Sequence, residues 1–371
     1  MIVLVAGDYC PRGRLASVIE DGDYAFVFKD VRDITRQADL SVLNLECPIV
    51  TEKLNPIDKC GGHLSCTISA IKAIKYAGFN CVTLANNHLL DYGQDGVKET
   101  LKKLDTEGIS HVGCGVDLKD ASRILYKEYG GQCLAIVNCC EHEFSIATYE
   151  TAGCNPLDPI KQFYAIRRAK QKADRVLVIV HGGHEHFQLP SPRMVDTYRF
   201  FIDAGADVVV NHHQHCFSGY ERYKGKPIFY GLGNFCFEKA SAHDGIWTEG
   251  FAVLLDMAED SPDFSIYPYR QCAEEPSVKM LSKGSYDNKL NELNRIISSG
   301  KLLNEEINKY YSSCYKKYEG IFEPLYNRLF IGAKSLGLLP SFVGKKRKLA
   351  ASNYVNCESH RDKLLYYLNK R

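Results

Sequence analysis

Residues of the kinds that bind metal ions follow several apolar segments of the chain. In order, they are Asp8, Asn44, Glu46, Asn86, Asn87, His88, His181, His212, His213 and His215. Imidazole and carboxylate ligands together suit Zn, Mn, Fe or Ni, whereas an all-oxygen set would suit Mg or Ca. Two such ions that share one carboxylate could activate a water molecule to displace a phosphoester leaving group. These residue types therefore favour a metal-dependent hydrolase.

Two histidine-rich segments carry most of this signal. His181 ends the apolar run Val-Leu-Val-Ile-Val and is followed by Gly182 and Gly183, which let the backbone approach a ligand closely. His213 and His215 are separated by one residue, so in an extended segment their side chains would point to the same side. Both segments are expected to contribute ligands to one site.

Apolar runs alternate with amphipathic stretches over the first 240 residues, which predicts an α/β protein. Strands are expected at residues 2–6, 40–43, 81–84, 133–138, 176–180, 207–210 and 227–231. Helices are expected at residues 68–77, 95–107, 160–173 and 192–204, and Gly78, Gly108 and Gly205 are expected as helix caps. Ligands of α/β sheets bind beyond the carboxyl ends of the strands, so the polar residues after these strands are expected to meet.

The length of the chain fits one large domain with an appendage, or two domains. Of its 371 residues, 45% are hydrophobic and 25% are charged, a composition that excludes a disordered or fibrous protein. From about residue 282 the sequence becomes polar, with helical stretches at residues 287–297 and 302–318. We expect a body at residues 1–280 and a helical, basic extension at residues 281–371.

Charge is distributed unevenly along the chain, although its net charge is only +1. Residues 301–371 contain 14 Lys+Arg and 6 Asp+Glu, which leaves residues 1–300 with an acidic surplus. The run Lys345, Lys346, Arg347 and Lys348 is expected to be solvated, with contact to an anionic partner or membrane surface as the alternative. Because the body is acidic and the expected site has no basic patch beside it, we expect no nucleic-acid partner.

Nothing in the sequence marks the chain for export or membrane insertion. The apolar run at residues 2–6 is too short for a signal peptide and no basic residue precedes it. No apolar stretch reaches the roughly 18 residues that a membrane helix needs. The 15 cysteines form no CxxC pair and are expected to be reduced, mostly buried thiols. We expect a cytoplasmic protein without an integral membrane segment.

Taken together, the polar motifs resemble those of a known family. They are Gly7-Asp8, Asn44-Leu45-Glu46, Ala85-Asn86-Asn87-His88-x-x-Asp91-Tyr92-Gly93, His181-x-Gly183-x-Glu185, His212-His213-x-His215 and Gly233-Asn234-Phe235. Their order is similar to that of the bacterial capsule synthesis (CapA, poly-gamma-glutamate) family of the calcineurin-like metallophosphoesterase superfamily, over roughly residues 1–240. The resemblance implies a four-layer α/β/β/α metallophosphoesterase-like sandwich with a helical C-terminal extension.

The same resemblance implies a centre of two divalent metal ions, Mn, Zn or Fe. It assigns Asp8 to the first ion, Glu46 to the bridging position, Asn87 and His181 to the second ion, and His213 and His215 to the closing pair. The superfamily usually has Asp-x-His at its first motif. Here Asp8 is followed by Tyr9 and Cys10, so one ligand of the first ion is missing.

Four further residues are candidates for substrate chemistry. By resemblance, His88 would be the general acid for the leaving group, and Glu185 would orient substrate or act as an acid or base. Glu185 could equally be a solvated loop carboxylate. Arg12 and Arg14 follow Asp8 at a distance from which a guanidinium could bind an anionic substrate, with ordinary surface charge as the alternative.

The leading functional hypothesis is a metal-dependent phosphoesterase that acts in capsule or surface-polymer biosynthesis on an anionic small-molecule or polymer substrate. A second hypothesis keeps the metal ions but changes the bond to a gamma-glutamyl amide, which would be hydrolysed or transferred. A third is a non-catalytic accessory subunit that works with other capsule-synthesis proteins. The sequence alone does not separate the two enzymatic hypotheses, because both need open coordination positions.

Overall fold

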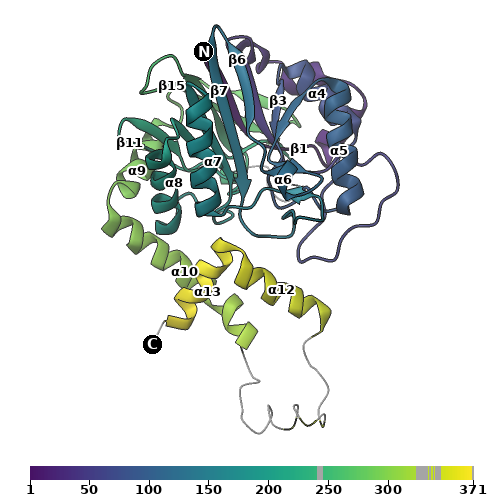
Figure 1. The fold of residues 1–371 in the computed structure, drawn as a ribbon, viewed down its shortest axis with the longest axis vertical. Helices are drawn as coiled ribbons and strands as arrows, with labels where there is room; N and C mark the ends of the chain where they lie inside the picture. Colours follow the sequence, from purple (N-terminus) through teal and green to yellow (C-terminus); the bar gives the residue numbers. More distant parts are fainter. Residues whose placement is uncertain (240–244, 323–332, 334–335, 337, 339–343, 370–371) are drawn as a thin grey trace.

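Two β-sheets packed face to face form the centre of the fold (Figure 1). A computed structural model describes residues 1–239, 245–322 and 344–369, together with residues 333, 336 and 338. The description of side chains in the long C-terminal helix ends at Cys314. Within the described residues, no helix is both long enough and apolar enough to cross a membrane.

The larger sheet combines parallel strands from the N-terminal part of the chain with antiparallel strands from residues 249–280. Its order is β16-β15-β14-β1-β2-β3-β4, and β13 also pairs with β1. The strands are β1 (Ile2–Cys10), β2 (Leu40–Leu45), β3 (Cys81–Thr83), β4 (Ser110–Val112), β13 (Asn234–Phe237), β14 (Glu249–Asp256), β15 (Asp263–Gln271) and β16 (Val278–Met280). The parallel strands β1, β2 and β3 end at the same edge, where their following residues meet.

The second sheet has the order β11-β12-β10-β9-β7-β6. Its strands are β6 (Leu125–Tyr129), β7 (Gln132–Cys140), β9 (Arg175–His181), β10 (Val208–His212), β11 (Tyr220–Tyr223) and β12 (Lys226–Phe229). The central strands β7, β9, β10 and β12 are parallel. A small separate sheet pairs β5 (Cys114–Gly115) with β8 (Gly153–Cys154).

Helices cover the outer faces of both sheets and continue beyond them. The helices of the body are α1 (Arg14–Glu20), α2 (Tyr24–Phe28), α3 (Arg32–Thr35), α4 (Ile68–Ala77), α5 (Gly93–Glu107), α6 (Leu118–Ala121), α7 (Pro159–Lys172), α8 (Pro192–Ala204) and the 3-10 turn η1 (Gly245–Trp247). The C-terminal helices are α9 (Asp287–Ile297), α10 (Gly300–Phe322), α12 (Lys345–Asn356) and α13 (Glu358–Asn369).

Alternating strand residues build the layers. In β1, Val3 and Val5 pack in the core between the two sheets, whereas Leu4 packs toward the helices on the outer face of the larger sheet. In β9, Leu177 lies between the sheets and Val178 faces α7 and α8. This alternation is the period of two that side chains have along a strand. The four-layer α/β/β/α sandwich expected by resemblance is confirmed.

The predicted elements of the body are confirmed, and the structure adds strands that the sequence pattern did not reveal. Each of the expected strands and helices coincides with an observed element to within a few residues. Gly78, Gly108 and Gly205 cap their helices in the left-handed conformation, with φ of 96°, 71° and 119°. The antiparallel strands β14 and β15 were not predicted. The 15 cysteines are free thiols, as expected.

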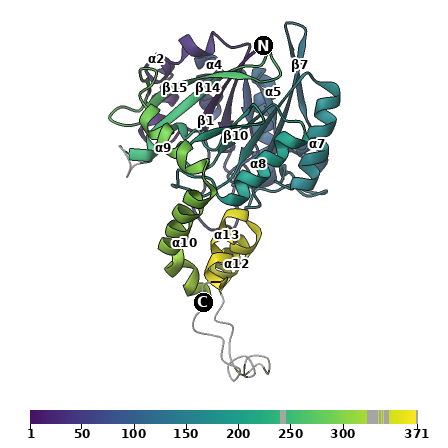
Figure 2. The same ribbon diagram turned by 90° about the vertical axis from the view of Figure 1, so that its left-hand side faces the viewer.

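The C-terminal helices α10, α12 and α13 lie together below the body (Figures 1 and 2). Buried polar contacts dock α13 onto the end of β7. Glu141 accepts hydrogen bonds from Arg193 Nη2 (2.7 Å) and from the Ser359 hydroxyl (2.6 Å), and Arg193 also donates to Asp362 (2.9 Å). The last strand of the body ends at Met280, but the division into domains at residue 280 stays a prediction.

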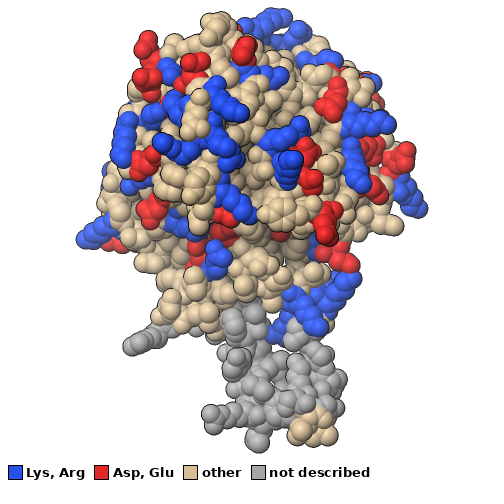
Figure 3. Space-filling view, viewed as in Figure 1, with Lys and Arg blue, Asp and Glu red and all other residues tan. Residues whose placement is uncertain are grey.

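Lys and Arg side chains gather over the start of α12 (Figure 3). Lys345, Lys346 and Lys348 are exposed, as the sequence predicted for this run. Lys345 forms an ion pair with Asp58 of a body loop, so a carboxylate of the same chain balances the charge of this lysine. Lys346 and Lys348 are exposed on the same helix.

Candidate metal centre

The polar residues that follow the parallel strands meet between the two sheets. Asp8 lies in β1 and Glu46 directly follows β2, while His181 ends β9. Asn44 joins the two sheets, because its Nδ2 donates to Asp8 Oδ1 (2.8 Å) and lies 3.2 Å from His181 Nδ1. The backbone N–H of His213 donates to Asp8 Oδ2 (3.1 Å) across the same junction. The site therefore depends on the packing of one sheet against the other.

A close approach of backbones positions Asp8. The Asp8 N–H donates to the carbonyl oxygen of Gly233 (3.2 Å). A Cβ at Gly7 would lie 1.9 Å from that same oxygen, so any side chain at Gly7 would force β1 away from the segment before β13. This contact explains the glycine before Asp8, whereas Gly233, before Asn234, has a left-handed φ of 79° and a Cβ there would lie 2.7 Å from the carbonyl oxygen of Glu249.

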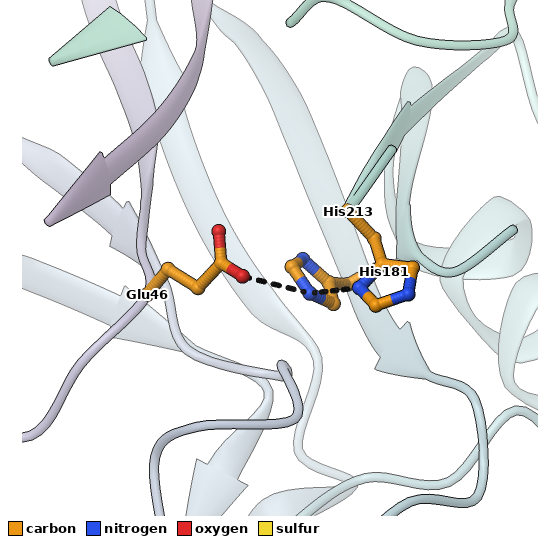
Figure 4. Close-up of side chains that lie close together, drawn as sticks. All are labelled: Glu46, His181 and His213. Atoms are coloured by element: carbon orange, nitrogen blue, oxygen red, sulfur yellow. Dashed lines mark hydrogen bonds and ion pairs between the residues drawn. The ribbon is translucent and has the colours of Figure 1, made fainter. Parts of the chain in front are cut away.

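Two groups of candidate ligands share the carboxylate of Glu46. In the first group, Glu46, His181 and His213 have ligand-type atoms within 4.8 Å of one another, and in the second Asp8, Glu46 and His215 do. Figure 4 shows Glu46 and His213 both directed at the ring of His181, at distances of 3.6 Å and 3.1 Å from its Nε2. Glu46 also lies 3.7 Å from His215 Nε2.

Asn87 completes the first group. Its side-chain oxygen lies 3.1 Å from His181 Nε2, the same nitrogen that faces Glu46 and His213. An amide oxygen, two imidazole nitrogens and a carboxylate oxygen thus surround one small space. In the second group, His215 Nδ1 is 2.9 Å from the side-chain oxygen of Asn234. This contact to the other ring nitrogen orients a candidate ligand, as is usual for metal-binding histidines.

The site fits a bound cation, as unpaired buried atoms show. Glu46 is fully buried, and neither of its carboxylate oxygens has a hydrogen-bond partner among the described residues. Within the same part of the chain, both ring nitrogens of buried His212 also lack one, although Nδ1 lies 3.5 Å from Asp8 Oδ1. A buried carboxylate without a donor or cation costs several kcal/mol. A positive ion between these groups would remove this cost.

Ionisation of the site follows from burial. Burial raises the pKa of Asp8 to about 6 and, with the neighbouring Asp8 carboxylate, raises the pKa of Glu46 well above its usual value. Burial and the imidazole of His213 lower the pKa of His181, and burial lowers the pKa of His215 to about 3. His181 and His215 are therefore neutral at physiological pH, which is the form that binds metal ions.

The backbone conformation of His213 and His215 differs from the predicted one. β10 ends at His212, and His213 and His215 have left-handed backbone conformations with φ of 92° and 56°. The predicted alternation along an extended segment is therefore wrong, although both side chains do face the site. Such conformations cost about 1–3 kcal/mol each in non-glycine residues and cluster at functional sites.

His88 lies beside the ligand groups in a hydrogen-bonded set of its own. Its Nδ1 is 2.8 Å from Asp91 Oδ2, and Asp91 forms an ion pair with the buried side chain of Lys59. Lys59 Nζ also lies 3.1 Å from His88 Nδ1. Asp91 is three residues after His88, a spacing visible in the sequence, whereas no local pattern singled out Lys59.

A cavity of about 470 Å³ opens over the site. The body supplies Lys59, Asn87, His88, Glu143, Glu185 and His213 to its lining. The C-terminal helices and the turn between them supply Tyr310, Cys314, Asn353, Cys357, His360 and Lys363. The volume is within the range typical of small-molecule sites. The C-terminal helices therefore form one wall of the candidate active site.

The remaining predicted residues differ in their relation to this cavity. Glu185 is exposed and lines it. Arg12 and Arg14 are exposed and are not among the residues that line it. Arg14 forms an ion pair with Glu238 and donates to the backbone oxygen of Glu274 (2.9 Å). Binding of an anionic substrate by either arginine stays a prediction without geometric support.

Comparisons with known proteins show the family to which the chain belongs. The family model of the bacterial capsule synthesis protein PGA_cap matches residues 2–239. The capsule biosynthesis protein CapA of Bacillus anthracis is 32% identical over 247 residues, which cover 64% of this chain and 60% of that protein. The PGA biosynthesis protein CapA of Bacillus subtilis (strain 168) is 33% identical over 236 residues, covering 63% of this chain and 62% of that protein.

The chain thus spans about three fifths of the length of these curated relatives. Among solved structures, a phosphatase from Mycoplasma pneumoniae is similar with a TM-score of 0.41 and 13% identity, over 73% of this chain and 88% of that one. The C-terminal helices that line the cavity lie beyond the residues that the family model matches.

Proposed function

Because the chain belongs to the PGA_cap family of bacterial capsule synthesis proteins, we propose that it is a metal-dependent phosphoesterase acting in capsule or surface-polymer biosynthesis. The observation that carries this proposal is Glu46, a fully buried carboxylate that two groups of candidate ligands share and that has no hydrogen-bond partner in the described part of the chain. A carboxylate in this position suits a bridge between two divalent cations.

Two sets of residues would hold the cations. His181, His213, Asn87 and Glu46 would hold one ion, and Asp8, His215 and Glu46 the other. When bound, a pair of Mn, Zn or Fe ions would supply positive charge for the phosphoryl oxygens and lower the pKa of a water nucleophile. The chain's part is to keep these side chains at fixed positions at the base of the cavity.

His88 would deliver the proton that the leaving group needs. Nδ1 of His88 lies 2.8 Å from Asp91 Oδ2, so we assign the proton on Nδ1 to this contact, and Nε2 would carry the transferred proton. In the reaction, the water loses one proton to solvent and its oxygen forms a bond to phosphorus, the ester P–O bond breaks, and the leaving oxygen takes the proton from His88, which solvent then replaces. Asp91 and Lys59 position the ring and do not touch the substrate in this scheme.

A substrate panel on the full chain tests this proposal. Phosphomonoesters and phosphodiesters are incubated with the wild type and with His213→Ala, each supplied with Mn, Zn or Fe. We expect hydrolysis by the wild type and its loss in His213→Ala. The matched control is His111→Ala, because His111 pairs with Asp105 away from the centre and its loss should leave turnover unchanged.

A second candidate function is cleavage or transfer at a gamma-glutamyl amide. The names of the family and of its Bacillus subtilis relative contain PGA, and the polymer poly-gamma-glutamate is linked by gamma-glutamyl amide bonds. This bond is therefore the second candidate for the bond that the site cleaves. Adding a gamma-glutamyl peptide to the same panel separates the two enzymatic proposals. If neither substrate class is turned over by a metal-loaded protein, the chain acts as an accessory subunit and the phosphoesterase proposal fails.

A further inference from the structure

A second cluster of ligand-type side chains lies at the C-terminal wall of the cavity. Glu143 belongs to the loop after β7, Cys357 joins α12 to α13, and His360 lies in the first turn of α13. None of the three belongs to the ligand groups around Glu46. All three line the cavity.

The three side chains converge on one point. Cys357 Sγ lies 3.6 Å and His360 Nε2 lies 3.7 Å from Glu143 Oε1, and the three ligand atoms are all within 4.8 Å of one another. In a tetrahedral zinc site, with metal–ligand distances of about 2.0–2.3 Å, neighbouring ligand atoms are about 3.3–3.8 Å apart. Two of the three separations already meet this requirement.

The charged groups around Glu143 would allow a cation to bind there. The Glu143 side chain is 11% exposed, and among the described residues His360 is its one ion-pair partner within 4.0 Å. The neighbouring Glu141 is already satisfied by Arg193 and Ser359. Cys357 Sγ lies 3.7 Å from Glu141 Oε2 as well, but Arg193 balances the charge of that carboxylate. The mostly buried carboxylate of Glu143 is therefore the negative charge that a bound cation would balance.

We propose that Glu143, Cys357 and His360 bind a divalent cation of the zinc type, in a site separate from the centre around Glu46. Thiolate, imidazole and carboxylate ligands together select zinc over magnesium or calcium. On binding, the cation takes the place of the thiol proton of Cys357, which is released to solvent.

The site would do two things. It would tie α12 and α13 to the loop after β7, beside the docking contacts of Glu141. Three protein ligands would also leave a fourth position for a water or substrate atom on the cavity side, as in catalytic zinc sites. Because Cys357 and His360 lie beyond the residues that the family model matches, the cation would be a feature of this chain's C-terminal part.

The competing explanation needs no cation. Burial and the two carboxylates raise the pKa of Cys357, so a metal-free thiol stays protonated and donates weak hydrogen bonds to Glu141 and Glu143. The two explanations differ in one observable. Only a bound cation gives a bond to sulfur.

Cobalt(II) titration of the full chain under reducing conditions detects this bond. After metal removal, binding of Co(II) at Cys357 should produce a sulfur-to-cobalt charge-transfer band in the near ultraviolet, with a final intensity that corresponds to one thiolate-bound cobalt per chain. The band should disappear in Cys357→Ser and persist in Cys314→Ser, whose thiol lines the same cavity but lies outside the cluster. Zinc analysis should find one equivalent fewer in Cys357→Ser than in the wild type.

Two more variants guard against misfolding and against confusion with the proposed function. Glu143→Gln keeps the shape of the side chain and should weaken Co(II) binding at this site at least about tenfold. His213→Ala, which removes a ligand of the other centre, should leave the band unchanged. A wild-type protein that binds cobalt without the band, or a band that survives Cys357→Ser, would overturn the proposal.

Discussion

Glu46 carries the negative charge on which both candidate ligand groups depend. Without a cation, this buried carboxylate receives no hydrogen bond from the residues that the structure describes, and Asp8 adds a second acid nearby. The metal-free protein should therefore be destabilised by its own site. Metal binding would turn the same charge into a source of stability.

This reasoning predicts a pH-dependent effect of Glu46→Gln in the metal-free protein. The pKa of Glu46 is raised in the folded state, so its contribution to stability is full below about pH 4.5 and is lost as pH rises through the folded pKa. At pH 8, Glu46→Gln should be more stable than the wild type by at least about 1 kcal/mol. At pH 4 the two should be equal, as measured by urea unfolding.

The exposed residue Glu52 gives the matched control, because Glu52→Gln should not change stability at either pH. With Mn or Zn added, the sign should reverse, since Glu46→Gln loses a ligand of both ions. A metal-free Glu46→Gln protein that is less stable than the wild type at pH 8 would contradict this account of the site.

His88 should act in catalysis and not in metal binding. His88→Ala should lower kcat by about 10²–10⁴-fold, the usual contribution of a general acid, and leave the metal content of the protein unchanged. Steady-state kinetics with metal analysis on the same preparation checks both. Loss of metal in His88→Ala would instead make His88 a ligand, and unchanged turnover would remove it from the mechanism.

Individual residues were predictable where the fold brings strand ends together. The sequence pointed to Asp8, Glu46 and His181 because each lies at or just past the end of an apolar run. It could not place Lys59, which reaches Asp91 from an irregular loop. Nor could it supply the left-handed conformations of the two histidines after β10, because tertiary contacts impose these on residues that rarely adopt them.

At the scale of elements, one buried ion pair joins the C-terminal helices to the body. Arg193 of α8 binds both Glu141, at the end of β7, and Asp362 of α13. The side chain of Glu141 is 3% exposed, so it would be a nearly unsolvated charge without Arg193. Breaking such a pair typically costs about 3–5 kcal/mol.

Arg193→Met should therefore speed hydrogen exchange in α13 and lower the free energy of unfolding by about 3–5 kcal/mol. Arg199→Met is the matched control on the same helix, because Arg199 pairs with Glu221 within the body. It should cost about 1 kcal/mol or less and leave the exchange of α13 unchanged. Equal exchange of α13 in both variants would show that Arg193 does not hold this helix.

The elements divide into those with a clear sequence pattern and those without one. β9 was predictable because an uninterrupted apolar run between turn residues is typical of a buried strand. α4 was predictable because an amphipathic repeat that ends at a glycine is typical of a helix. β14 pairs with β1, which lies far away in the sequence, whereas β15 pairs with its chain neighbours β14 and β16. Long-range pairing of this kind leaves no local signal that a single sequence can show.

At the scale of the whole molecule, the centre lies where three parts of the chain meet. The two sheets supply the ligands, and the C-terminal helices supply the far wall of the cavity. We propose that residues 281–371 serve the site in this way, as an extension of the body at residues 1–280. The polarity of this segment was predictable, but its position over the site depends on contacts such as Arg193 with Asp362.

The measurement that tests the central claim most directly is electron paramagnetic resonance of the manganese-loaded chain. A pair of ions bridged by Glu46 predicts two equivalents of Mn(II) with an exchange-coupled signal, and loss of that coupling in Glu46→Gln. Absence of bound manganese, or only the signal of isolated ions in the wild type, would contradict a shared-carboxylate centre between the two sheets.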